Sequence, residues 1–284
     1  MKSQFVYRPH TLYVTITTSA LLLTSQLYGA VILGTASGTD LQVAVSALSL
    51  VTLAVGPLAH AQISSSAPGS QVNGVLSVNE LKIIGGVSAE NGTNNALVAS
   101  AFSNVTGIAT TGLTIGAATT HNLGITLIPG ILFTPDFLNI TSTTIGSTST
   151  SSGQYSALTS VGTSVLEGLM ISVSGVNITI PLNPAPNTLL VLAGLGLDSN
   201  IVANLSIMLN EQLPIGNGTD LSGITTNALH ISIKALNLSV VTGLNGDIVV
   251  GKSSSSLTAI PEPSALVMVA GGVASCMILR RRKN

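Results

Sequence analysis

Hydrophobic and polar residues alternate along most of the chain between Val31 and Leu257. An apolar residue at every second position is typical of a β-strand that buries one face. Valine, isoleucine and threonine, which favour strands, are abundant, and glycine, asparagine and serine separate the runs. The clearest alternation occurs at residues 41–45, 169–173, 176–182 and 229–233. We therefore expect a mostly β domain, a β-sandwich or a jelly-roll-like fold.

A helical period is hard to find in the same region. The best candidate is residues 188–197, extending toward Leu209, but this segment is rich in glycine, which weakens helices. The uncharged run 41–61 is long enough for a membrane helix. Its period-two start and its Gly56-Pro57 break favour buried strands instead.

Three segments change the parity of their apolar positions. They align without gaps at residues 43–50, 171–178 and 231–238, and in each the apolar residues move from odd to even positions after a small residue. Such a change predicts a bulged or bent strand, or at Ser174-Gly175 a two-residue hairpin turn. Chance similarity in a Val/Ser/Leu-rich chain is the alternative explanation.

Residues 1–30 have the three parts of a secretory signal peptide. Lys2 and Arg8 precede an uncharged run at 11–27, and small residues follow. Cleavage after Ala30 or, with better spacing of small residues, after Ala36 would release the rest of the chain through the Sec translocon. An uncleaved N-terminal anchor helix is the alternative.

Residues 264–279 form a second uncharged, mostly apolar segment. As a helix it would be about 24 Å long, short of a hydrocarbon core of about 30 Å, so we expect a marginal single transmembrane helix. The three arginines that follow favour a cytoplasmic end, which places the body outside. Two prolines keep the chain extended just before the helix. These flanking residues are Pro261, Glu262, Pro263, Arg280, Arg281 and Arg282.

The tail 261–284 resembles the PEP-CTERM sorting signal in its Pro-Glu-Pro start, short apolar helix and arginine end. The resemblance implies transient anchoring in the inner membrane and cleavage near Pro-Glu-Pro by an exosortase. It further implies delivery to the cell surface or to an exopolysaccharide matrix. An ordinary C-terminal anchor is the alternative.

Two parts of the body resemble the choice-of-anchor type P family. Residues 227–233 followed by 246–253 are similar to its closing strands, and residues 37–43 followed by 55–57 are similar to its opening strand. This resemblance implies a shared β-rich body with variable surface anchors and no associated activity.

Two low-complexity stretches suggest how the body is divided. Residues 141–153 are nearly all serine and threonine, and residues 253–256 are four serines. We expect an exported β-rich domain at 31–252 that contains a Ser/Thr-rich loop at 141–153. A flexible spacer at 253–260 would then lead to the sorting signal.

Charge is scarce in this sequence and argues against nucleic-acid binding. Charged residues make up 7% of the chain. Between residues 31 and 260 nine acidic residues outnumber three lysines, which gives a net charge of −6. A body of this kind has no basic stripe to neutralise phosphates. The single cysteine, Cys276, lies in the tail, so the monomer cannot form a disulfide.

One nucleotide-binding motif matches formally. Gly246, Gly251, Lys252 and Ser253 fit the spacing G-x4-G-K-[ST] of a phosphate-binding loop. That loop needs flexible residues between a strand and a helix, whereas Asp-Ile-Val-Val favours a strand and four serines follow. We interpret the match as accidental.

No motif for nucleophilic catalysis or for a metal cofactor is present. The chain has no G-x-S-x-G sequence, and its histidines are isolated. Asp220 and Asp247 are weak calcium candidates because they lie in the oxygen-rich sequences Asn217-Gly-Thr-Asp220 and Asn245-Gly-Asp247, but such sequences commonly form turns without a metal. We therefore expect no cofactor.

These observations favour a non-enzymatic structural or adhesive protein of the cell surface or biofilm matrix, with exopolysaccharide as a partner. The alternative is a secreted polysaccharide-acting enzyme whose two carboxylates meet only in space. Such a pair would lie about 5–10 Å apart in a cleft.

Overall fold

The computed structural model describes residues 30–47, 51–55, 59–65, 69–76, 81–83, 96–105, 110–128, 135–239 and 241–261. Residues 1–29 of the signal peptide expected at 1–30, and residues 262–284 of the sorting signal expected at 261–284, lie outside the described residues. Within the described part, no helix is both long and apolar enough to cross a membrane.

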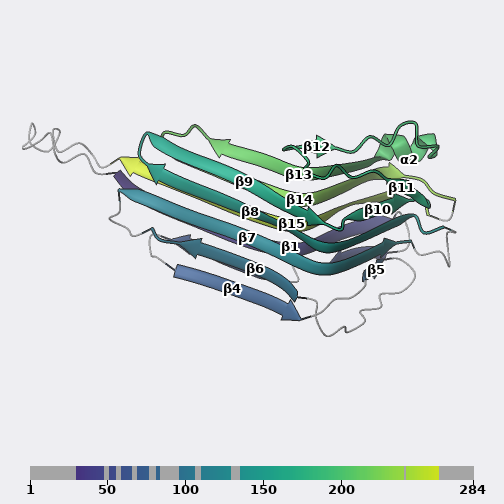
Figure 1. Ribbon diagram of the computed structural model, residues 1–284, viewed down its shortest axis with the longest axis horizontal. Coiled ribbons are helices and arrows are strands. Elements are labelled where there is room, and N and C mark those ends of the chain that lie inside the picture. Colours follow the sequence, from purple (N-terminus) through teal and green to yellow (C-terminus); the bar gives the residue numbers. More distant parts are fainter. Residues whose placement is uncertain are drawn as a thin grey trace, which may run out of the picture.

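Two mostly antiparallel sheets pack face to face, as a β-sandwich requires (Figure 1). The first sheet has the order β12-β13-β14-β15-β1-β2, and β3 pairs with another part of β1. Its strands are β1 (Ala30–Ala47), β2 (Val51–Val55), β3 (His60–Ser65), β12 (Thr188–Leu189), β13 (Leu205–Gly216), β14 (Leu221–Leu236) and β15 (Leu244–Pro261).

The second sheet has the order β11-β10-β8-β7-β6-β4. Strand β8 pairs with β10 near its beginning and with β9 along the rest of the same edge. Strand β5 pairs with β7 in the parallel direction. The strands are β4 (Gly69–Leu76), β5 (Leu81–Ile83), β6 (Ala96–Ser103), β7 (Thr111–Leu127), β8 (Leu138–Gln154), β9 (Ala157–Glu167), β10 (Met170–Val173) and β11 (Val176–Ile178). A mostly β, two-sheet architecture is thus confirmed.

Partway along each long strand, the buried positions switch from one set of alternate residues to the other. In β7 the buried residues are even-numbered from Gly112 to Thr120 and include the odd-numbered Leu123 and Ile125 beyond it. The pairing of β7 with β8 keeps its register across this point. Asn122 has a positive φ of 51° there, and Gly251 of β15 and Asn210 of β13 have similar values at the corresponding change in the first sheet. We call the position at which the strands change their buried side the crease. It is marked by Asn122, Asn210 and Gly251.

On one side of the crease the sandwich is filled with aliphatic side chains, and we call this part the lobe. Phe137, Ile125, Ile171, Leu229 and Ile248 are among its fully or almost fully buried residues. Burial of such apolar surface is the main force that holds two sheets together.

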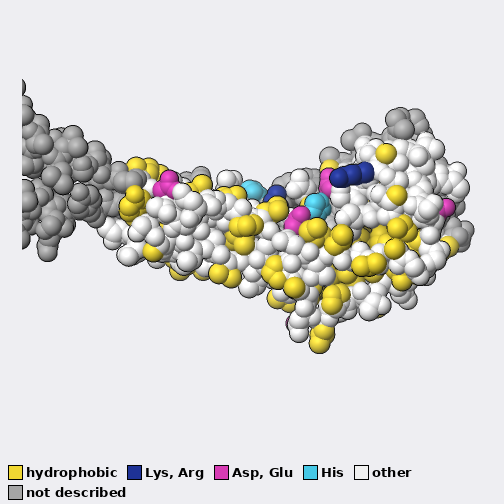
Figure 2. Space-filling view, turned by 90° about the horizontal axis from the view of Figure 1, so that it is seen from above, with side chains coloured by type: hydrophobic (Ala, Val, Ile, Leu, Met, Phe, Trp, Pro, Cys, Tyr) yellow, Lys and Arg dark blue, Asp and Glu magenta, His cyan; other side chains and the backbone are white. Residues whose placement is uncertain are grey.

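On the other side of the crease, in the part that we call the neck, small residues fill the interior next to the crease. A small apolar cluster of Ile32, Val105, Leu158, Leu257 and Ala259 fills the interior at the far end. Ser147, Ser149 and Ser151 of β8 are buried against Ser253 and Ser255 of β15. Their hydroxyl groups bond across the interface, for example Ser147 to Ser253 at 2.7 Å and Ser151 to Ser255 at 2.8 Å. The molecule is accordingly narrower in this part than around the lobe (Figure 2).

These contacts show that two sequence predictions were wrong. Residues 141–153 form part of β8 rather than a loop, and residues 253–260 form part of β15 rather than a flexible spacer. Serine runs are usually solvated linkers, but here alternate hydroxyls of the neck are buried and paired between closely spaced sheets, namely those of Ser147, Ser149, Ser151, Ser253 and Ser255. The β-domain therefore extends through Pro261 and does not end at residue 252.

The remaining local predictions had mixed outcomes. Ser174 and Gly175 form the expected two-residue turn, with φ values of 48° and 77° between β10 and β11. The register of β14 shifts between Ile233 and Leu236, as the parity change predicted. The candidate helix at 188–197, extending toward Leu209, is not helical over 188–197. A six-residue helix, α2 (Ser199–Asn204), lies within the extension and is capped by the Asp198 side chain. The described part of 41–61 is in strands, not a membrane helix.

Candidate functional site

The structure places the beginning of the sorting signal beside the beginning of the domain. Pro261, the last residue of β15, is the register partner of Ala30, the first residue of β1. Both lie at the neck end of the sandwich, far from α2 (Figure 1). Glu262, Pro263, Arg280, Arg281 and Arg282 lie outside the described residues.

The formal phosphate-loop motif is part of a strand. Residues 246–253 are continuous with the rest of β15, and the buried Ser253 hydroxyl bonds to Ser147 and Ser149. Gly251 has a φ of +61°, but it belongs to the crease rather than to a loop before a helix. The stretch therefore lacks the backbone cradle that a phosphate needs.

The two weak calcium candidates lie far apart. Asp220 is beside Leu221, the partner of Thr258, whereas Asp247 lies 11 positions earlier on β15. At about 3.3 Å per residue, this separation is about 36 Å. The Asn217 side chain accepts hydrogen bonds from the amides of Thr219 and Asp220, so this sequence is an ordinary side-chain-stabilised turn. The described residues contain no group of acidic, histidine or cysteine residues arranged to hold a metal.

A histidine that looked isolated in the sequence joins two carboxylates on the outer face of the first sheet. Nδ1 of His230 lies 2.9 Å from Oε2 of Glu211, and Nε2 lies 3.2 Å from Oδ1 of Asp247. The Asn227 amide also donates to Oε2 of Glu211, at 2.6 Å. We call Glu211, Asn227, His230 and Asp247 the histidine cluster. In the view from above in Figure 2, few charged and histidine side chains are visible, and several of them lie close together where the neck widens.

The histidine cluster does not have the arrangement expected of a carboxylate-pair hydrolase. Glu211 and Asp247 flank opposite sides of one imidazole ring, which occupies the space between them. Neither carboxylate lines the groove described next. An imidazole in this position can donate to both carboxylates only when both nitrogens carry a proton. The arrangement therefore supports cross-strand pairing rather than attack on a substrate.

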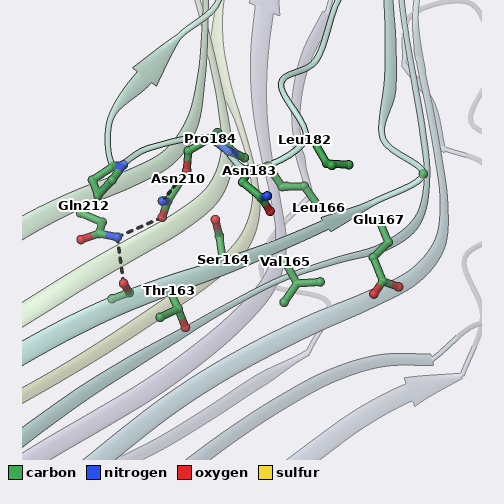
Figure 3. Close-up of a pocket in the computed structure, with 13 residues that line it drawn as sticks. Thr163, Ser164, Val165, Leu166, Glu167, Leu182, Asn183, Pro184, Asn210 and Gln212 are labelled. Atoms are coloured by element: carbon green, nitrogen blue, oxygen red, sulfur yellow. Dashed lines mark hydrogen bonds between the residues drawn. The ribbon is translucent and has the colours of Figure 1, made fainter.

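An open groove of about 780 Å³ lies along the end of β9. One wall is Gly162–Gly168, another is the segment that contains Leu182, Asn183, Pro184 and Pro186, and the third is Asn210 with Gln212 on β13 (Figure 3). We call this feature the amide groove.

Hydrogen bonds made by the side chains of Asn210 and Gln212 hold the walls of the amide groove together (Figure 3). Nε2 of Gln212 donates to the Gly162 carbonyl at 2.8 Å and to Oδ1 of Asn210 at 3.0 Å. Nδ2 of Asn210 donates to the Pro184 carbonyl at 3.1 Å. Asn210 has a φ of 50°, a left-handed conformation that asparagine tolerates better than most residues, and it is buried.

Sequence reasoning missed both the histidine cluster and the amide groove. Their residues come from separate strands and a loop, so no motif spacing reveals them. The tripeptide Asn210-Glu211-Gln212 was the available signal, because three consecutive amide or acidic residues interrupt an otherwise apolar strand. In the structure the middle residue joins the histidine cluster and its two neighbours line the groove.

No protein-family model matches this chain, and no curated protein matches it at a significant level.

Proposed function

We propose that this chain is an exported, non-enzymatic protein of the bacterial cell surface or exopolysaccharide matrix, with a structural or adhesive role. A signal peptide would direct it to the Sec translocon. The tail at 261–284 would hold it briefly in the inner membrane until an exosortase cuts near Pro261-Glu262-Pro263.

One structural observation carries this proposal: β1 and β15 pair from Ala30↔Pro261 to Ser46↔Asn245. Because these strands are antiparallel, the proposed signal peptide and sorting signal join the domain at the same end. A body attached in this way extends away from the membrane along the strand direction. It would hold the lobe and the amide groove farther from the membrane than the neck.

The same strand pairing favours signal cleavage after Ala30 over cleavage after Ala36. Residues 30–36 form the beginning of β1, where Ile32 and Ala36 are buried. Cleavage after Ala36 would remove this segment and leave the Leu257 end of β15 without its β1 partner, since Leu257 pairs with Gly34.

Substitution of the sorting residues tests the proposal. Glu262→Ala combined with Pro263→Ala leaves Pro261 and therefore the whole of β15 unchanged. In a bacterium that contains an exosortase, we expect this double variant to remain in the inner-membrane fraction, while the unaltered chain reaches the cell surface. Asn284→Ala, at the other end of the tail, is the matched control and should behave like the unaltered chain. Equal surface delivery of the double variant would refute the sorting role.

A further inference from the structure

We propose that the amide groove binds a neutral oligosaccharide chain. This inference gives the adhesive role proposed above a ligand class and rests on that role. The binding itself is a property of the groove and can be measured separately from export.

The groove is pre-organised for a ligand. The Asn210 and Gln212 bonds described above tie the Leu182–Pro186 segment to β13, and β13 to β9. The main-chain N–H of Gln212 also donates a hydrogen bond to Oδ1 of Asn187, at 2.7 Å. Asn187 directly follows the Leu182–Pro186 segment, so this bond holds the same loop against β13. Walls that are already ordered reduce the entropy lost when a ligand binds.

Several polar groups in the groove remain available to a ligand. Within the described part of the chain, the side chains of Thr163, Ser164 and Asn183 make no hydrogen bond. Among the strands that the structure describes, β9 pairs with β8 alone and has its other edge open. The Gly162 carbonyl points to the free side, where Gln212 reaches it, so the main-chain groups of Ser164 and Leu166 share that direction. Hydroxyl, amide and peptide groups both donate and accept, as sugar hydroxyls do.

The charge of the lining selects the kind of sugar. Glu167 is the one ionisable residue among the described groove residues, and no lysine, arginine or histidine accompanies it. An acidic polysaccharide with uronate, sulfate or phosphate groups would meet no positive partner there and would be repelled by Glu167. The lining therefore favours a neutral chain.

Apolar side chains beside these polar groups match the C–H faces of sugar rings. The Leu182 residue is 92% exposed and the Val165 residue 49% exposed, so both offer open apolar surface. The lining residues that the structure describes include no aromatic ring, which limits the stacking energy. We therefore expect weak binding, with a dissociation constant of about 1 mM per site.

A peptide ligand fits the groove less well. An added strand needs a run of free main-chain groups, but the start of β9 is already bonded through Leu158 to Gly218 and through Gly162 to Gln212. Only Ser164 and Leu166 remain before the chain turns at Gly168, whose φ is +61°. Two residues of pairing would hold a strand poorly.

Affinity electrophoresis tests the inference on the full chain. The protein is kept in a detergent without a sugar headgroup and is run through native gels that contain galactomannan, mixed-linkage β-glucan, dextran or arabinoxylan. Alginate serves as the acidic polymer. We expect at least one neutral polymer to retard the chain and alginate to leave it unretarded.

The variant Ser164→Ala combined with Asn183→Ala should weaken that retardation at least tenfold. Neither side chain bonds within the described structure, so this variant keeps the fold, which its melting curve verifies. The matched control is Ser206→Ala, which removes an exposed hydroxyl from β13 outside the groove.

Three results would overturn the inference: no retardation by any neutral polymer, equal retardation of the double variant, or stronger retardation by alginate. A chain that is exported and cut at its tail but shows one of these results would refute the groove proposal and leave the sorting proposal intact. Normal groove binding by a chain that keeps its tail uncut would do the reverse.

Discussion

Gly116 of β7 lies directly against the main chain of Ser254 in β15, on the facing sheet. A Cβ atom at position 116 would be 2.3 Å from the Ser254 carbonyl oxygen and 2.2 Å from that of Ser37. Facing sheets usually lie about 10 Å apart because side chains fill the space between them. In the neck the two main chains approach far more closely, which glycine and serine permit.

Gly116→Ala should therefore destabilise the domain. The new methyl group would collide with two main-chain carbonyls that cannot move independently, and we expect a loss of about 1–3 kcal/mol in unfolding free energy. Chemical denaturation monitored by circular dichroism measures this change. Gly69→Ala is the control, because among the described residues a Cβ there meets the Ile63 side chain alone, at an ordinary contact distance of 3.7 Å. Equal effects of the two substitutions would contradict close main-chain contact in the neck.

Ser149→Ala should also weaken the neck, through lost hydrogen bonds rather than collision. Its buried hydroxyl lies within 3.1 Å of the Ser253 carbonyl, the Ser253 hydroxyl and the Thr226 hydroxyl. Removing it leaves buried polar groups without this partner, at a cost of about 1–3 kcal/mol. The exposed Ser206→Ala should change stability by less than about 0.5 kcal/mol. If Ser149→Ala melts with the unaltered chain, the hydroxyl contacts do not stabilise the fold.

The histidine cluster should respond unequally to loss of its two carboxylates. The Glu211 side chain is 13% exposed and accepts from both His230 and Asn227. The Asp247 side chain is 57% exposed, and within the described part of the chain its one polar partner is His230. We expect Glu211→Gln to cost about 1–3 kcal/mol and Asp247→Asn less than about 1 kcal/mol. Thermal unfolding of the two isosteric variants makes the comparison. A larger effect for Asp247→Asn would show that the cluster is organised differently.

The β-rich fold was predictable because alternation survives in segments such as Leu229–Ile233, whose odd-numbered residues fill the lobe. The neck was not predictable from the same rule. From Ser147 to Ser152, buried and half-buried positions alternate as regularly as in any aliphatic strand, but every position is a serine or a threonine. A hydropathy pattern cannot show which serines are buried. The distinction depends on a second serine strand, β15, lying opposite.

The site residues were hidden for a related reason. Glu211, His230 and Asp247 lie on three neighbouring strands, and their proximity follows from the registers Glu211↔Asn227 and Ser232↔Asp247. Those registers depend on where each hairpin turns. In contrast, the Ser174-Gly175 turn was predictable, since its geometry is fixed by two adjacent residues.

Intact-mass spectrometry of the protein recovered from the cell surface tests the central claim most directly. If the chain is exported and sorted as proposed, its N-terminus will follow Ala30 and its C-terminus will lie near Pro261, so that the mature chain begins and ends at the paired ends of β1 and β15. A surface protein that still carries Asn284 would contradict the account.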